Sequence, residues 1–220
     1  TMISAFITHT EDATEGLTRF GREVVKEMNH LGIMIDVSHA SEGTLDVIKY
    51  STQPIIASHS SSKALCDHDR NLTDEQLRAL AKNGGVAQLC LLDAYINKNP
   101  KAASVCDAAE HLDHMIKVAG IDMWDGTDFD GGGGLQGCNG DNDLINLTIK
   151  MIEKGYTEED LRKIWGGNLL RVMKQVQEAP LLSSKNADNT QTRIIKIYRN
   201  ILLSFSEFIG TVSPIDSLFL

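Results

Sequence analysis

The sequence IMIDVSH, at residues 33–39, joins an apolar run to a Ser-His pair, and the sequence PIIASH, at residues 54–59, repeats this arrangement. A short apolar run bounded by turn signals is typical of a buried strand in a parallel sheet. The carboxyl ends of parallel strands meet on one face, so we expect His39 and His59 to share one metal ion there. Neutral imidazole suits zinc and similar cations. The alternative interpretation makes each histidine a polar strand-end residue that is satisfied by a local hydrogen bond.

Further strands and helices alternate along the chain. Apolar runs predict strands at residues 2–8, 33–37, 54–57, 86–91 and 121–129. Helical periodicity and capping signals predict helices at 17–31, 41–50, 73–82, 103–118, 143–153, 157–164 and 168–176. Successive strand-helix units indicate an α/β fold with a parallel sheet, wound either into an open sheet or into a barrel.

The length of the chain limits how much of a barrel it can form. A complete TIM-type (β/α)8 barrel needs about 250 residues, and we expect about five βα units here, so the predicted barrel is incomplete. The composition changes after Ala179 and Pro180 to a polar stretch and then to a mixed apolar tail. We therefore assign residues 1–178 to the partial barrel and 179–220 to a linker and a tail without an assigned role.

The composition is that of a soluble globular protein. The 220 residues are 42% hydrophobic and carry a net charge of −9, which argues against a nucleic-acid partner because phosphate binding needs clustered Lys and Arg. The four cysteines form no C-x-x-C pair, so we expect a reducing compartment such as the cytoplasm. A secreted or membrane-anchored location would require a signal upstream of Thr1. No apolar run is long enough to cross a bilayer.

A third candidate element is GTDFDG at residues 126–131, where the fifth predicted strand ends. A carboxylate at that end is suited to take a proton from an activated water. The alternative is an ordinary Asp-rich turn. His111 and His114 lie one helical turn apart and would permit a metal site, but their apolar neighbours favour simple helix packing.

Several motifs occur in the order that resembles the membrane (renal-type) dipeptidase family, the amidohydrolase-like peptidase family M19. The similarity extends from about Thr8 to Val176. The motifs are GLTRFG at 16–21, DVSH at 36–39, SHSS at 58–61, RNLTD at 70–74, DFDG at 128–131 and GNLLR at 167–171.

The resemblance implies a TIM barrel with two zinc ions that hydrolyses dipeptides. His39 and His59 match the two histidines of one zinc, so one half-site is evident in the sequence. Asp128 matches the aspartate that handles the proton of the attacking water, and Arg70 matches the arginine that binds the C-terminal carboxylate of the substrate. His9 resembles the histidine that polarises the scissile carbonyl. For Arg70, the alternative is a surface salt bridge with the neighbouring Asp67 or Asp69.

The sequence departs from the family pattern in three places. The His-x-Asp pair and the bridging Glu of the other zinc half-site belong to strands that should precede Thr1. The stretch around Trp124 and Asp125 is one residue short, which leaves its register open, and residues 179–220 match nothing in the family. These departures leave a second hypothesis, a catalytically incomplete homologue. Its open strand edges would favour association, including a homodimer.

Overall fold

The computed structural model describes residues 16–40, 43–121 and 124–183. The chain divides into two units, Thr1–Pro180 and Leu181–Leu220, and the first contains the site. The strand expected at residues 2–8 lies outside the described residues, as does Ser41, the expected cap of the second helix.

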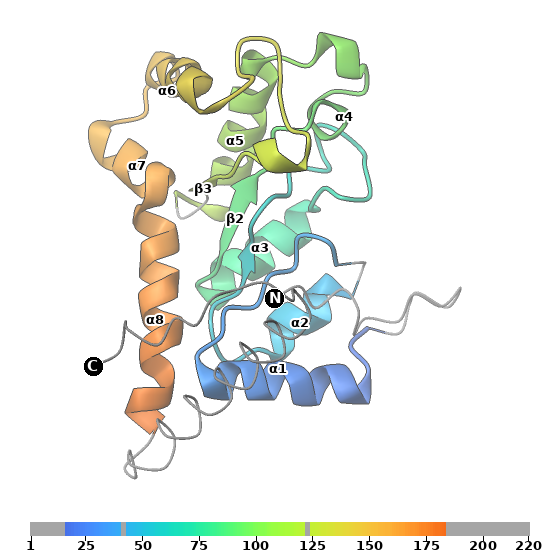
Figure 1. The fold of residues 1–220 in the computed structure, drawn as a ribbon, viewed down its shortest axis with the longest axis vertical. Coiled ribbons are helices and arrows are strands. Elements are labelled where there is room, and N and C mark those ends of the chain that lie inside the picture. Colours follow the sequence, from blue (N-terminus) through green and yellow to red (C-terminus); the bar gives the residue numbers. More distant parts are fainter. Residues whose placement is uncertain (1–15, 41–42, 122–123, 184–220) are drawn as a thin grey trace, which may run out of the picture. The chain divides into compact units, whose positions relative to one another are not determined.

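The described strands form one parallel sheet whose order follows the chain. A bridge at Asp36 pairs with β1 (Ile56–Ala57), β1 pairs with β2 (Val86–Leu89), and β2 pairs with β3 (Trp124–Asp125). In this register Ile56 lies opposite Val86. Helices connect the successive strands (Figure 1), so the prediction of an α/β fold with parallel strands is confirmed.

Helix ends follow the capping rules. Thr73 starts its helix with a capping box that involves Gln76, and Gly32 and Gly84 end two helices in the left-handed conformation that glycine adopts without strain. The α-helices are α1 (Arg19–Leu31), α2 (Thr44–Tyr50), α3 (Asp74–Asn83), α4 (Asp93–Ile96), α5 (Val105–Ala119), α6 (Leu144–Glu153), α7 (Glu158–Arg162) and α8 (Asn168–Ser183). The short 3-10 helices are η2 (Pro100–Ala102), η3 (Phe129–Gly131) and η4 (Asp141–Asp143), and η5 (Lys163–Gly167) is a π-helical segment.

The two faces of the sheet are covered differently. One face belongs to the main core, where Ala57 and Leu89 are fully buried with residues of the connecting helices. On the other face, Ile56 and Val86 pack against Val172 and Val176 of α8. Side chains alternate along a strand, so Ser58 shares a face with Ile56. This second face is apolar near the amino ends of the strands and becomes polar toward the carboxyl ends.

Several predicted bounds are wrong. The strands expected at residues 33–37, 54–57 and 86–91 are observed as a bridge at Asp36, as Ile56–Ala57 and as Val86–Leu89. The strand expected over residues 121–129 is observed at Trp124–Asp125, and backbone hydrogen bonds continue beyond it from the N–H of Gly126 to the carbonyl oxygen of Leu89 at 3.1 Å and from the N–H of Leu91 to the carbonyl oxygen of Thr127 at 3.0 Å. Helix α8 continues to Ser183 instead of ending near Val176: Gln177, Glu178 and Ala179 favour helix, and the helix runs on through Pro180 although proline has no backbone N–H to donate. No helix among the described residues has the length and apolarity to span a membrane.

Candidate functional site

The two histidines meet at the carboxyl end of the sheet. His39 follows the bridge strand at Asp36, and His59 follows β1. Their Nε2 atoms are 2.8 Å apart, and the rings are edge to face with centroids 4.8 Å apart. The structure thus brings together the pair that the repeated Ser-His motif predicted to converge.

Asp36 joins these two strand ends through hydrogen bonds. Its Oδ1 accepts from the backbone N–H of Ser38 at 2.9 Å, the hydroxyl of Ser38 at 2.8 Å and the backbone N–H of Ser58 at 3.1 Å. Its Oδ2 accepts from the hydroxyl of Ser58. The same Ser58 oxygen lies 2.8 Å from Nδ1 of His59. His59 is therefore connected to a carboxylate through one hydroxyl.

The charge state of His39 favours metal binding. Partial desolvation lowers its pKa, as do electrostatic interactions with Arg70 and His59, while Asp128 and Asp36 act in the opposite direction. A lowered pKa keeps the imidazole neutral, which is the form that binds a metal ion. These interactions also indicate that Arg70 and Asp128 lie near His39.

Arg70 has two guanidinium nitrogens that lack a hydrogen-bond partner. Its Nε and Nη1 atoms are buried and make no hydrogen bond, and its Cζ lies 5.6 Å from the ring centroid of Tyr95. The carboxylates of Asp67 and Asp69 instead form ion pairs with Nζ of Lys63, at 3.5 and 3.3 Å. The alternative of a surface salt bridge at Arg70 is therefore wrong. Buried unpaired donors of this kind are suited to receive a carboxylate from a ligand.

Asp128 adopts an unusual backbone conformation. It has φ of 59° and is the one residue other than glycine with positive φ in the part of the chain that the structure describes. Its carbonyl oxygen accepts from the N–H groups of Gly131 and Gly133, at 3.0 and 2.9 Å. Its Oδ2 lies 3.5 Å from the thiol of Cys90, whose pKa is raised to about 12, chiefly by burial. Left-handed non-glycine residues cluster at functional sites.

The two imidazoles fit a zinc ion as part of a ligand set. Zinc binds imidazole nitrogen at about 2.0–2.1 Å, and tetrahedral geometry then separates two such nitrogens by about 3.3 Å. The Nε2 atoms of His39 and His59, now 2.8 Å apart, would need to separate only slightly to reach that spacing. No group of three or more His, Cys, Asp or Glu side chains able to hold a metal occurs within residues 16–40, 43–121 and 124–183. His9, the remaining candidate, lies outside the described residues.

His111 and His114 do not converge on a metal. Nδ1 of His111 accepts from the backbone N–H of Ser62 at 3.1 Å, and Nε2 lies 2.9 Å from the carbonyl oxygen of Ile96. His114 pairs with Asp74 at 2.8 Å. The prediction of helix packing is confirmed for both histidines.

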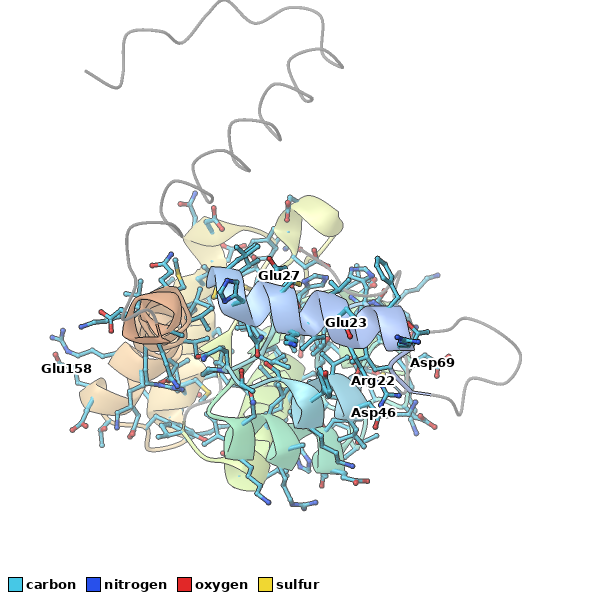
Figure 2. The ribbon with its side chains drawn as sticks, turned by 90° about the horizontal axis from the view of Figure 1, so that it is seen from below. Arg22, Glu23, Glu27, Asp46, Asp69 and Glu158 are labelled. Carbon is cyan, nitrogen blue, oxygen red and sulfur yellow. The ribbon has the colours of Figure 1, made fainter. Side chains whose placement is uncertain are left out.

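A cavity of about 220 Å³ near the start of α1 is separate from the histidines. It is lined by Leu17, Arg22, Asp46, Lys49 and Tyr50, and Figure 2 shows Arg22 and Asp46 close to each other there. Asp46 Oδ2 accepts from the backbone N–H of Leu17 at 3.3 Å. The carboxylate of Asp46 in the cavity wall therefore already accepts a hydrogen bond from the segment that precedes α1.

Sequence reasoning missed the roles of Asp36, Ser58, Cys90 and Tyr95. Asp36 and Ser58 stood in the quoted motifs, and the available signal was that both precede a histidine on neighbouring strands. Cys90 and Tyr95 had no such signal, because their contacts join segments that are far apart in the sequence.

Comparisons with known proteins identify the family to which the chain is similar. The family model of the membrane dipeptidases, peptidase family M19, matches residues 3–187. An uncharacterized dipeptidase of Schizosaccharomyces pombe is 39% identical over 181 residues, covering 79% of this chain and 43% of that protein. The dipeptidase tcpJ of Claviceps purpurea is 36% identical over 166 residues, covering 74% and 39%. The chain thus spans less than half the length of these curated relatives.

Solved structures give the same result. The probable dipeptidase PvdM from Pseudomonas aeruginosa has a TM-score of 0.73 at 28% identity, covering 77% of this chain and 57% of that chain. A metallo peptidase from Rhodobacter sphaeroides, solved with a phosphinate mimic of the dipeptide L-Ala-D-Ala, has a TM-score of 0.70 at 34% identity, covering 74% and 48%. The chain belongs to the membrane dipeptidase family, peptidase family M19.

Proposed function

We propose that the protein is a zinc-dependent dipeptidase, which hydrolyses the peptide bond of dipeptides with a metal-activated water. The observation that carries this proposal is that two buried guanidinium nitrogens of Arg70 make no hydrogen bond, close enough to the converging imidazoles for Arg70 to lower the pKa of His39. Cleavage of the peptide bond next to a free C-terminus requires a cationic group that can bind the terminal carboxylate and that lies near the metal ligands.

We also propose that the described strands are part of a TIM-type barrel. An open, doubly wound sheet reverses its strand order at a switch point. Here the order along the sheet is the order along the chain from Asp36 to β3, without a reversal. This continuous order supports the barrel over the open sheet.

Each site residue has a distinct task in the proposed reaction. His39 and His59 would hold one ion, and when bound the ions would supply Lewis-acid activation of water and of the scissile carbonyl. Arg70 would bind the C-terminal carboxylate with its planar fork of donors and so set the distance from that end to the cleaved bond. Asp128 would accept the proton of the attacking water at Oδ2 and return it to the leaving amine. His9 is the proposed group for polarising the carbonyl.

The test is a hydrolysis assay on the purified chain loaded with zinc. A panel of dipeptides, including L-Ala-D-Ala, is compared with the same dipeptides amidated at the C-terminus. We expect turnover of the free acids that a chelator abolishes and zinc restores, with little turnover of the amides because they lack the carboxylate for Arg70.

A different outcome would favour the catalytically incomplete homologue. That hypothesis expects no chelator-sensitive turnover and at most one weakly bound ion per chain. It also expects association of chains, including a homodimer, because unpaired strand edges promote pairing. Metal analysis and light scattering on the assayed sample distinguish the two hypotheses.

A further inference from the structure

We infer that Asp36 and Ser58 form a positioning relay, which holds His59 in its Nδ1-protonated tautomer and presents Nε2 as an electron-pair donor. The inference concerns the atoms of the chain itself. It rests on the proposed function only in naming zinc as the ion that Nε2 would receive.

The direction of the hydrogen bonds follows from counting protons. A carboxylate only accepts, so Asp36 takes the hydroxyl protons of both Ser38 and Ser58. The oxygen of Ser58, having given its proton to Asp36, can only accept from the ring nitrogen of His59 that lies 2.8 Å away. Nδ1 of His59 must then carry the hydrogen, and in a neutral ring Nε2 is left with its lone pair.

The opposite tautomer is disfavoured by the same contacts. If Nδ1 of His59 were the acceptor, Ser58 would have to donate to it, and Oδ2 of Asp36 would lose its hydroxyl donor. A hydrogen bond to a carboxylate is stronger than one to a neutral acceptor, so Ser58 keeps its proton directed at Asp36.

The relay also fixes the backbone at the strand ends. The N–H of His59 donates to the hydroxyl oxygen of Ser38 at 2.9 Å, while Ser38 is itself held by Oδ1 of Asp36. The ring and the main chain of His59 are therefore both tied to one carboxylate. Asp36 and Ser58 are positioning residues, because they act on the proposed metal site only through His59.

The first measurement is nitrogen-15 NMR of the histidine rings in the metal-free chain of 220 residues, at a pH where His59 is neutral. The wild type should show His59 with hydrogen on Nδ1. In Asp36→Asn the side-chain amide donates to Ser58, which reverses the hydroxyl and moves the His59 hydrogen to Nε2. In Ser58→Ala the preference should be lost, and Ser58→Thr should restore it.

The second measurement is zinc affinity by competition with a chromophoric chelator. We expect Asp36→Asn and Ser58→Ala to weaken zinc binding by about 10- to 100-fold, as is typical for partners of a metal ligand. Ser60→Ala is the matched control. It removes a hydroxyl next to His59 that is directed at the carbonyl oxygen of Ser38, at 3.4 Å, so neither tautomer nor affinity should change.

The outcomes separate the relay from the proposed function. An unchanged His59 tautomer in Ser58→Ala, or weaker zinc binding in Asp36→Asn without a tautomer change, would overturn the relay. The expected tautomer changes in a wild-type protein that binds no zinc would support the relay and count against the metallodipeptidase. If Asp36→Asn fails to fold, the comparison of Ser58→Ala with Ser58→Thr decides.

Discussion

The two sides of the site differ in how their polar groups are satisfied. On the histidine side, both carboxylate oxygens of Asp36 accept hydrogen bonds, and the ring and backbone of His59 have partners. On the other side, two buried nitrogens of Arg70 have no hydrogen bond, and the carboxylate of Asp128 meets the thiol of Cys90 at a long 3.5 Å.

This difference separates groups that are positioned in advance from groups that await a ligand. A saturated network holds its atoms in one arrangement, which lowers the cost of ordering them when an ion binds. Unsatisfied buried donors cost stability, and the cost is recovered only when a ligand supplies the acceptor. The difference supports the proposal that the metal binds on the first side and the substrate carboxylate on the second.

The largest effect is expected from removing a ligand on the saturated side. His59→Ala should weaken zinc binding by more than about 100-fold, which exceeds the usual effect of losing a supporting residue. Isothermal titration with zinc measures this change. The matched control is His30→Ala, since His30 is an exposed histidine in the last turn of α1. Equal losses in both variants would contradict the assignment.

On the unsatisfied side, Arg70→Met should lower kcat/KM for dipeptides by about 100-fold, because a charge-assisted carboxylate pair contributes about 1.5–3 kcal/mol. Activity toward dipeptide amides should change little. Steady-state kinetics on both substrate series measures the difference. A uniform loss on acids and amides would argue that Arg70 supports the fold and does not select the carboxylate.

The two sides should also respond differently in stability. Asp36→Ala leaves the donors of Ser38 and Ser58 without their acceptor and should lower the free energy of unfolding by about 2 kcal/mol. Arg70→Met removes unpaired buried donors and should leave that free energy equal or raise it by up to about 1 kcal/mol. Denaturant unfolding of the metal-free variants measures both. If Asp36→Ala and Arg70→Met lowered the free energy of unfolding by the same amount, the two sides would not differ in how their polar groups are satisfied.

His111 predicts that the free energy of unfolding depends on pH, because its buried ring accepts a hydrogen bond from the backbone N–H of Ser62. Burial lowers its pKa from 6.5 to about 4, so unfolding takes up a proton between these values. The stability from the neutral ring is complete above pH 6.5 and falls as the pH drops toward 4, with a slope of up to about 1.4 kcal/mol per pH unit.

His111→Gln should flatten this dependence, although the variant is less stable at pH 7 because it keeps only part of the hydrogen bonding. Thermal unfolding between pH 4 and 7.5 is the measurement. His30→Gln, at an exposed position, should retain the wild-type slope. A slope unchanged in His111→Gln would mean that another group carries the proton uptake.

The smallest effect is expected at Cys90. Cys90→Ser keeps a donor for Asp128 and should change kcat/KM by less than about threefold. Because burial raises the thiol pKa to about 12, Cys90 should also resist alkylation at pH 8, while the exposed Cys106 reacts first. Mass spectrometry of the labelled peptides gives the order of reaction, and rapid labelling of Cys90 would contradict its burial.

Much of the fold was predictable because local rules govern it. Apolar runs indicated the strands β1 and β2, and the glycines Gly32 and Gly84 ended helices where left-handed backbone is needed. Local rules failed at β3, which is shorter than its apolar run. There the regular strand ends at Asp125, although the N–H of Gly126 still donates to the carbonyl oxygen of Leu89 at 3.1 Å, so its bounds depend on contacts with another segment.

The same division applies to the site. The sequence alone determined that His39 and His59 would meet, because parallel strands direct successive carboxyl ends to one face. Only the tertiary structure decided that Asp36 reaches Ser58, since that contact depends on the register between two strands. Tertiary structure also decided that Arg70 is unpaired, because Lys63 takes the carboxylates nearest to it in sequence. Sequence periodicity fixes which face a side chain occupies, whereas its partners depend on how separate segments are brought together.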